Sequence, residues 1–134
     1  ATIITAGNNG ISAASGILTL NIGELANVTP DVGNDTIIKL DDGPPINFCK
    51  PAVDPMMQSL IKIYGQTILG VILTGMGQDG LEGGRELIKN NGRLIAQDKE
   101  TSTVWGMPGA VASAGLCHKI LPLDEIGPWI KKLF

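Results

Sequence analysis

A buried strand that leads directly into a glycine-rich turn and a helix is the feature that most constrains this fold. Residues Ile68–Thr74 form a nearly continuous apolar run, which is typical of a strand covered on both faces. The turn Gly75–Gly80 follows, and Leu81–Asn90 has the pattern of a helix that ends at Gly92. Units of this kind build parallel sheets.

The chain continues to alternate between strands and helices after this unit. We expect strands at Arg93–Gln97 and His118–Pro122 and helices at Pro108–Ala114 and Asp124–Phe134. Gly127-Pro128 is expected to delay the start of the last helix. The pattern predicts an α/β fold, a parallel sheet flanked by helices in a Rossmann-like three-layer arrangement.

Short β-branched or alternating segments precede the buried strand. They predict strands at Thr2–Thr5, Ile17–Ile22 and Thr36–Leu40, with an antiparallel β-hairpin near the N-terminus. Asp54–Tyr64 has an apolar helical face, and its first two residues suit an N-cap followed by proline at the first helical position.

Composition and charge exclude several classes of function. Ten basic residues against 13 acidic ones leave a net charge of −3, without the basic excess that neutralises nucleic-acid phosphates. Hydrophobic residues make up 43% of the 134, enough for a core, yet no apolar run approaches the roughly 20 residues that span a bilayer. Cys49 and Cys117 show neither metal-ligand spacing nor a disulfide framework. We therefore expect a cytoplasmic domain with no nucleic-acid partner and no membrane insertion.

The turn Gly75–Gly80 carries the most informative chemistry. It spells G-x-G-x-x-G after a strand, and Asp98 lies 18 residues after Gly80, near the place of a ribose-binding acid. A dinucleotide- or phosphate-binding module is therefore one hypothesis. Asp79 opposes it, because a carboxylate at the start of the helix competes with phosphate for the same amides.

Two other interpretations of the turn remain open from the residues alone. The glycines make a tight strand-to-helix turn, and Asp79 then only caps the helix. Alternatively, an acid at the carboxyl edge of a parallel sheet orients a histidine during acyl transfer. No histidine precedes Asp79 and no G-x-S-x-G motif occurs, and His118, the only histidine, is expected to be ordinary structure.

Several motifs follow one another in a characteristic order along the chain. They are Asp41-Asp42-Gly43-Pro44-Pro45-Ile46-Asn47, Pro51-Ala52-Val53-Asp54, Leu73-Thr74-Gly75-Met76-Gly77-Gln78-Asp79-Gly80, Ala96-Gln97-Asp98, Val104-Trp105-Gly106-Met107-Pro108 and Leu121-Pro122-Leu123-Asp124-Glu125-Ile126. In this order they resemble the catalytic domain of CheB-type chemotaxis protein-glutamate methylesterases. The resemblance is strong from about Asp35 to the C-terminus and looser over residues 1–34.

The resemblance implies a serine hydrolase that removes methyl esters from chemoreceptor glutamates and releases methanol, with deamidation of receptor glutamines in some relatives. It assigns Asp79 to the triad acid that orients the histidine, and Met76, through its backbone, to the oxyanion pocket. It implies no organic cofactor and no metal. The implied partners are methylated chemoreceptors and a response-regulator receiver domain in the full-length protein.

The family's serine and histidine motifs do not occur in this sequence. Residues 1–134 are therefore expected to form a partial methylesterase catalytic domain that is inactive alone. A non-catalytic relative that docks on receptors is the further alternative.

Overall fold

A computed structural model describes residues 2–5, 10–14, 17–21, 27–30, 36–39 and 43–133. Its central sheet has the strand order β1-β6-β7-β8, and each neighbouring pair is parallel. The strands are β1 (Thr2–Thr5), β6 (Ile68–Ile72), β7 (Arg93–Gln97) and β8 (Lys119–Leu121). The predicted parallel sheet is confirmed.

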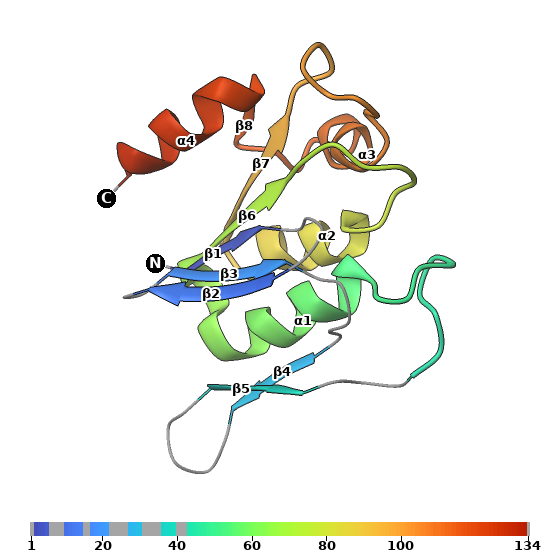
Figure 1. The fold of residues 1–134 in the computed structure, drawn as a ribbon, viewed down its shortest axis with the longest axis vertical. Coiled ribbons are helices and arrows are strands. Elements are labelled where there is room, and N and C mark those ends of the chain that lie inside the picture. The colour runs from blue at the N-terminus through green and yellow to red at the C-terminus, as the bar shows by residue number, and fades with distance from the viewer. Residues whose placement is uncertain are drawn as a thin grey trace.

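Helices cover both faces of this sheet (Figure 1). Three of them, α1, α2 and α3, lie on one side, and α4 lies on the other. Their bounds, with the short 3-10 turn η1 that leads into β6, are α1 (Val53–Tyr64), η1 (Gly65–Thr67), α2 (Leu81–Lys89), α3 (Met107–Ser113) and α4 (Leu123–Lys131).

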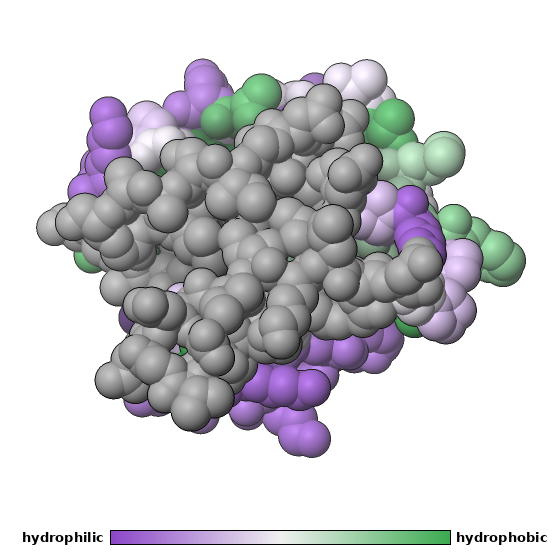
Figure 2. Space-filling view, turned by 60° about the horizontal axis from the view of Figure 1, so that its bottom comes forward, coloured by the Kyte–Doolittle hydropathy of each residue, from purple (hydrophilic) through white to green (hydrophobic). Residues whose placement is uncertain are grey.

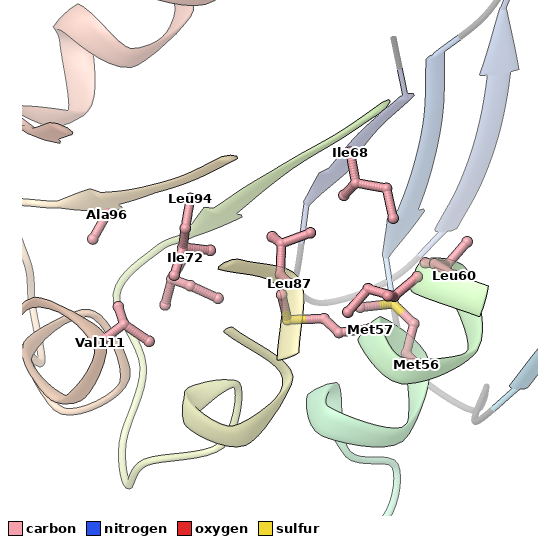
Figure 3. Packing of buried hydrophobic residues seen from close by; sticks show 10 residues of the cluster. Met56, Met57, Leu60, Ile68, Ile72, Leu87, Leu94, Ala96 and Val111 are labelled. Carbon is pink, nitrogen blue, oxygen red and sulfur yellow. The ribbon is translucent and has the colours of Figure 1, made fainter. Parts of the chain in front are cut away.

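The larger core cluster lies between the sheet and the first three helices. Met57 of α1, Leu87 of α2 and Leu94 of β7 point toward one another in its centre (Figure 3). Every residue of β6 is buried, which explains why its sequence reads as a continuous apolar run. The strand that precedes the glycine-rich turn is therefore held rigidly.

A smaller cluster fills the opposite face. Ile126 of α4 packs with Leu69, Val71 and Ile95, and Trp129 lies partly buried against them. Alternate residues of β6 thus serve opposite clusters, as the pleat of a strand requires.

The described residues also form two antiparallel ladders outside the central sheet. One joins β2 (Gly10–Ala14) to β3 (Ile17–Asn21), and the other joins β4 (Asn27–Pro30) to β5 (Thr36–Lys39). The connection between β2 and β3 falls outside the described residues, so the N-terminal hairpin stays a prediction.

Two expectations about helix starts are wrong. α1 begins at Val53, and its N-cap is Ala52, which offers no side-chain cap, so Asp54 does not occupy the expected N-cap position. α4 begins at Leu123 and contains Pro128, so the proline does not delay the start of the helix. Pro128 is exposed, and water can satisfy the carbonyl that its missing N–H leaves free.

The described surface is mixed in character. In the space-filling view, hydrophilic residues gather along the lower edge and separate hydrophobic residues project at the right (Figure 2). Among the described residues, no helix combines the length and the apolar character that a membrane crossing requires.

Candidate active site

The turn between β6 and α2 is fixed to the loop that precedes α3. The amide of Gly75 donates to the carbonyl of Val104 over 3.0 Å. The carbonyl of Gly75 accepts from the amides of Gly106 and Met107 at 3.1 and 2.8 Å. Both polar groups of this first turn residue are thus satisfied by one neighbouring loop, which sets the direction in which the chain leaves β6.

Buried Gln97, the last residue of β7, supports the same region. Its Oε1 accepts from the amide of Thr74 at 2.8 Å, and its Nε2 donates to the carbonyl of Thr101 at 2.8 Å. Its own carbonyl accepts from the indole Nε1 of Trp105 at 3.2 Å. Gln97 thereby connects the 98–105 loop to the carboxyl ends of β6 and β7. This loop in turn holds Gly75, so the start of the turn is fixed.

Asp79 lies buried at the carboxyl end of the sheet, with 5% of its surface exposed. Its Oδ2 accepts from the amide of Val53 at 2.6 Å, and its Oδ1 accepts from the amides of Asp54 and Gly80 at 3.1 and 3.0 Å. Asp79 therefore supplies the side-chain cap that Ala52 cannot give to α1. The side chain of Asp79 also lies at the N-terminus of α1, where the amides of Val53 and Asp54 point toward it.

The hydrogen bonds of Asp79 leave it one acceptor site. A carboxylate offers about four lone-pair sites. Two amides occupy Oδ1 and one occupies Oδ2, so one site on Oδ2 remains free of donors from the described residues. A buried, oriented carboxylate with one free acceptor has the properties needed to hold an imidazole N–H.

Met76 lies on the outer part of the turn. Its side chain is 84% exposed, so it contributes nothing to the core. The backbone amides of Met76, Gly77 and Gln78 donate to no acceptor within the described part of the chain. Free amides at the carboxyl end of a parallel sheet can bind a developing oxyanion. The turn thus places a fixed acid and free donors within four successive residues.

The start of α2 is already occupied by carboxylates. The amide of Gly83 donates to Asp54 Oδ1 at 2.7 Å, and the amide of Gly80 donates to Asp79 Oδ1. A phosphate bound at a helix N-terminus needs such amides free and meets repulsion from nearby carboxylates. The arrangement therefore does not favour the dinucleotide-binding hypothesis.

Other residues considered in the sequence lie away from the acid or serve local structure. His118 bonds to the backbone of Leu94 at the amino end of β7, whereas Asp79 follows the carboxyl end of β6. Asp98 accepts from the amide of Thr101 at 3.0 Å and closes a turn. Cys49 and Cys117 are both free thiols. Within the described ranges, no group of three or more His, Cys, Asp or Glu residues is placed to hold a metal ion.

Sequence reasoning missed two residues that shape the site. Asp54 was expected to cap its own helix, but its side chain reaches Gly83, which is 29 positions away. Gln97 belongs to the Ala96-Gln97-Asp98 motif, which gives no sign that its side chain holds both Thr74 and Thr101. Neither partner is signalled by local spacing, because both bonds join segments that meet only in the folded sheet.

The fold and this turn define an α/β domain whose candidate active site lies where a parallel strand enters a helix. Comparison with known proteins gives the family. The CheB methylesterase family model matches residues 4–130, so the chain belongs to the CheB methylesterase family. The resemblance noted from the motifs is confirmed.

Individual relatives agree with the family. The chain is 56% identical over 102 residues to a protein-glutamate methylesterase/protein-glutamine glutaminase of Rhodopseudomonas palustris, covering 76% of this chain and 26% of the relative. It is 51% identical over 111 residues to a protein of the same name from Paramagnetospirillum magneticum, covering 83% and 29%. The chain thus spans just over a quarter of the length of these curated relatives.

A solved structure has the same fold. The crystal structure of the Thermotoga maritima CheB methylesterase catalytic domain superposes with a TM-score of 0.80 and 31% sequence identity. The match covers 96% of this chain and 68% of that domain.

Proposed function

We propose that residues 1–134 belong to a protein-glutamate methylesterase of serine type, in which Asp79 is the acid of the catalytic triad. The observation that carries this proposal is the buried Asp79 carboxylate, held by three amides with one acceptor site left over. The relatives' names and the match of the chain to the family supply the reaction.

The mechanism assigns a separate role to each part of the turn. A serine and a histidine from outside residues 1–134 complete the triad. The remaining site on Asp79 Oδ2 accepts the N–H of the histidine and holds its other nitrogen toward the serine. The serine attacks the ester carbonyl, methanol leaves, and water hydrolyses the acyl-enzyme to give glutamate. The amide of Met76 stabilises the oxyanion in both steps.

The substrates follow from the same assignment. The proposed protein partners are methylated chemoreceptors, and the enzyme is proposed to act on them in the cytoplasm. A receiver domain is the proposed regulatory partner in the full-length protein. The relatives are also named protein-glutamine glutaminases. Attack on a side-chain amide gives a similar tetrahedral oxyanion, from which ammonia leaves in place of methanol, so we propose glutamine deamidation as a second reaction of the same site.

Methanol release from methylated chemoreceptor membranes tests the proposal. The 134-residue chain is expected to be inactive, and the protein extended by its upstream coding sequence is expected to be active. Asp79→Ala in the extended protein should lower the rate by about four orders of magnitude, as loss of triad orientation does. Turnover by the short chain that disappears in Asp79→Ala, or an inactive extended protein, contradicts the proposal.

Parallel measurements distinguish the remaining alternatives. Ammonia release from receptors that carry glutamine tests deamidation. A titration with NADH should show no saturable binding, because carboxylates occupy the amides of Gly80 and Gly83. Receptor binding by the extended protein without methanol or ammonia release would instead indicate a non-catalytic docking protein.

A further inference from the structure

The proposed mechanism makes no use of the buried side chain of Asp54. Asp54 is the second residue of α1 and only 3% exposed. Its Oδ1 accepts from the amide of Gly83 in the first turn of α2 at 2.7 Å, and its Oδ2 accepts from Asn47 Nδ2 at 2.9 Å. Both oxygens are directed away from its own helix, so this acid joins three segments of the chain.

The backbone of the same residue binds Asp79. The amide of Asp54 donates to Asp79 Oδ1 at 3.1 Å. Asp79 therefore caps α1, while Asp54, at the start of α1, caps α2. We call these two reciprocal contacts the cross-cap. Because α2 begins two residues after Asp79, the cross-cap closes a ring that fixes the position of the Asp79 carboxylate.

A glycine in α2 makes this contact possible. A Cβ on Gly83 would lie 2.8 Å from Met57 Cβ and 3.2 Å from Asp54 Oδ1. The close approach of α1 to α2 therefore requires a residue without a side chain at this position. The absence of a side chain at Gly83 thus lets the Asp54 carboxylate reach the backbone of the first turn of α2.

Burial of the Asp54 and Asp79 carboxylates between α1 and α2 is energetically unfavourable. Desolvation raises the pKa of Asp54, and repulsion from Asp79 raises it further, while the hydrogen bond from Gly83 acts in the opposite direction. Asparagine would serve Gly83 without a charge, but its amide nitrogen would face the donor of Asn47. An aspartate offers an acceptor to both neighbours in the observed arrangement.

We propose that Asp54 is a positioning residue of the methylesterase site, which holds the start of α1 against α2 so that the free acceptor site of Asp79 stays directed at its partner. This inference rests on the proposed function. Asp54 touches no reacting atom in the proposed mechanism. It acts through the Val53 and Asp54 amides that bind Asp79.

Steady-state kinetics of the extended protein test the role in catalysis. Asp54→Ala removes both acceptors and is expected to lower kcat at least tenfold with KM changed less than twofold. Asp54→Asn keeps an oxygen for Gly83 and should recover part of the lost kcat. Ile61→Val, a buried change in the same helix outside the cross-cap, is the control for a simple loss of stability and should keep the wild-type kcat.

The amide spectrum of the 134-residue chain tests the cross-cap without any turnover. In Asp54→Asn, the amide proton resonances of Val53 and Gly80, which donate to Asp79, should shift, whereas Ile61→Val should leave them in place. Gly83→Ala should shift the same resonances by forcing the helices apart, and Gly127→Ala, with open space around its Cβ, should not.

The outcomes separate this inference from the function on which it rests. Unchanged kcat in Asp54→Ala, or unchanged Val53 and Gly80 resonances in both Asp54→Asn and Gly83→Ala, overturns the positioning role. An extended wild-type protein with no methanol release contradicts the proposed methylesterase instead, because the amide spectrum still reports the cross-cap.

Discussion

The amide of Val53 donates to Asp79 Oδ2 over 2.6 Å, so a helix without a side-chain cap of its own is capped by an acid 26 positions further along the chain. The same contact that stabilises α1 orients the proposed triad acid. Structure and catalysis therefore depend on one carboxylate, and substitutions of Asp79 should affect both.

Asp79→Ala should destabilise the 134-residue chain even though the chain is expected to be inactive. Three amides lose a charged acceptor in a mostly buried place, which should lower the free energy of unfolding by about 3 kcal/mol. Asp79→Asn keeps one oxygen and should lose about half as much. Urea unfolding measures the difference.

An exposed acid provides the control for this prediction. Asp124 lies exposed in the first turn of α4, near the positive end of the helix dipole, and its side chain bonds to none of the described residues. Asp124→Ala should cost about 0.5 kcal/mol. If Asp79→Ala and Asp124→Ala lower the free energy of unfolding equally, the hydrogen bonds of Asp79 to the start of α1 add no stability beyond that of an exposed acid.

Gly106→Ala should displace the turn that carries Met76. A Cβ at this position would lie 2.7 Å from the carbonyl oxygen of Gly75 and 2.8 Å from the amide nitrogen of Gly77. Both are backbone atoms, so the turn itself must shift. We expect kcat of the extended protein to fall at least a hundredfold, because oxyanion donors act only over a narrow range of distances.

Gly127→Ala is the matched control for Gly106→Ala. No atom lies within 4 Å of a Cβ at Gly127, which sits inside α4. Alanine should stabilise this helix by about 0.5–1 kcal/mol and leave kcat unchanged. If both variants keep the wild-type kcat, the geometry of the turn around Met76 does not limit the reaction.

The buried Asp54 predicts a pH dependence of stability. Its pKa is raised in the folded chain, chiefly by desolvation and then by Asp79, so the folded state binds the proton more tightly than the unfolded state. Stability from this group is therefore lost as pH rises from the ordinary aspartate pKa of 3.8 through the higher folded pKa. Asp54→Asn cannot titrate, so its free energy of unfolding relative to wild type should rise from pH 3 to pH 7.

Chemical denaturation at several pH values measures this difference, and Asp98→Asn serves as the control because Asp98 closes a local turn outside the cross-cap. A relative stability of Asp54→Asn that stays constant or falls with rising pH would contradict the raised pKa.

Periodicity predicts the sheet and the helices well because the apolar pattern of each buried face lies within one short segment of the sequence. The continuous apolar run of β6 and the glycine-rich turn after it placed Asp79 at the carboxyl end of a strand. The motif then supplied its proposed role. The cross-cap could not be predicted, since Val53 and Asp79, like Asp54 and Gly83, meet only when α1 and α2 pack. Long-range capping also explains why the local sequence predicts an N-cap at Asp54, whereas the N-cap of α1 is Ala52 and the capping side chain is that of Asp79.

Cys117 should react slowly with alkylating reagents in the folded chain. Burial raises the pKa of its thiol from 9.0 to about 11, which lowers the thiolate fraction near pH 8 about a hundredfold. In a Cys49→Ser background, iodoacetamide should therefore modify Cys117 about a hundred times more slowly than in the urea-unfolded chain. Mass spectrometry follows the adduct, and Cys49→Ser/Cys117→Ser controls for reaction elsewhere. Equal rates in the folded and unfolded chains would mean that the thiol is not desolvated by its packing against the larger core cluster.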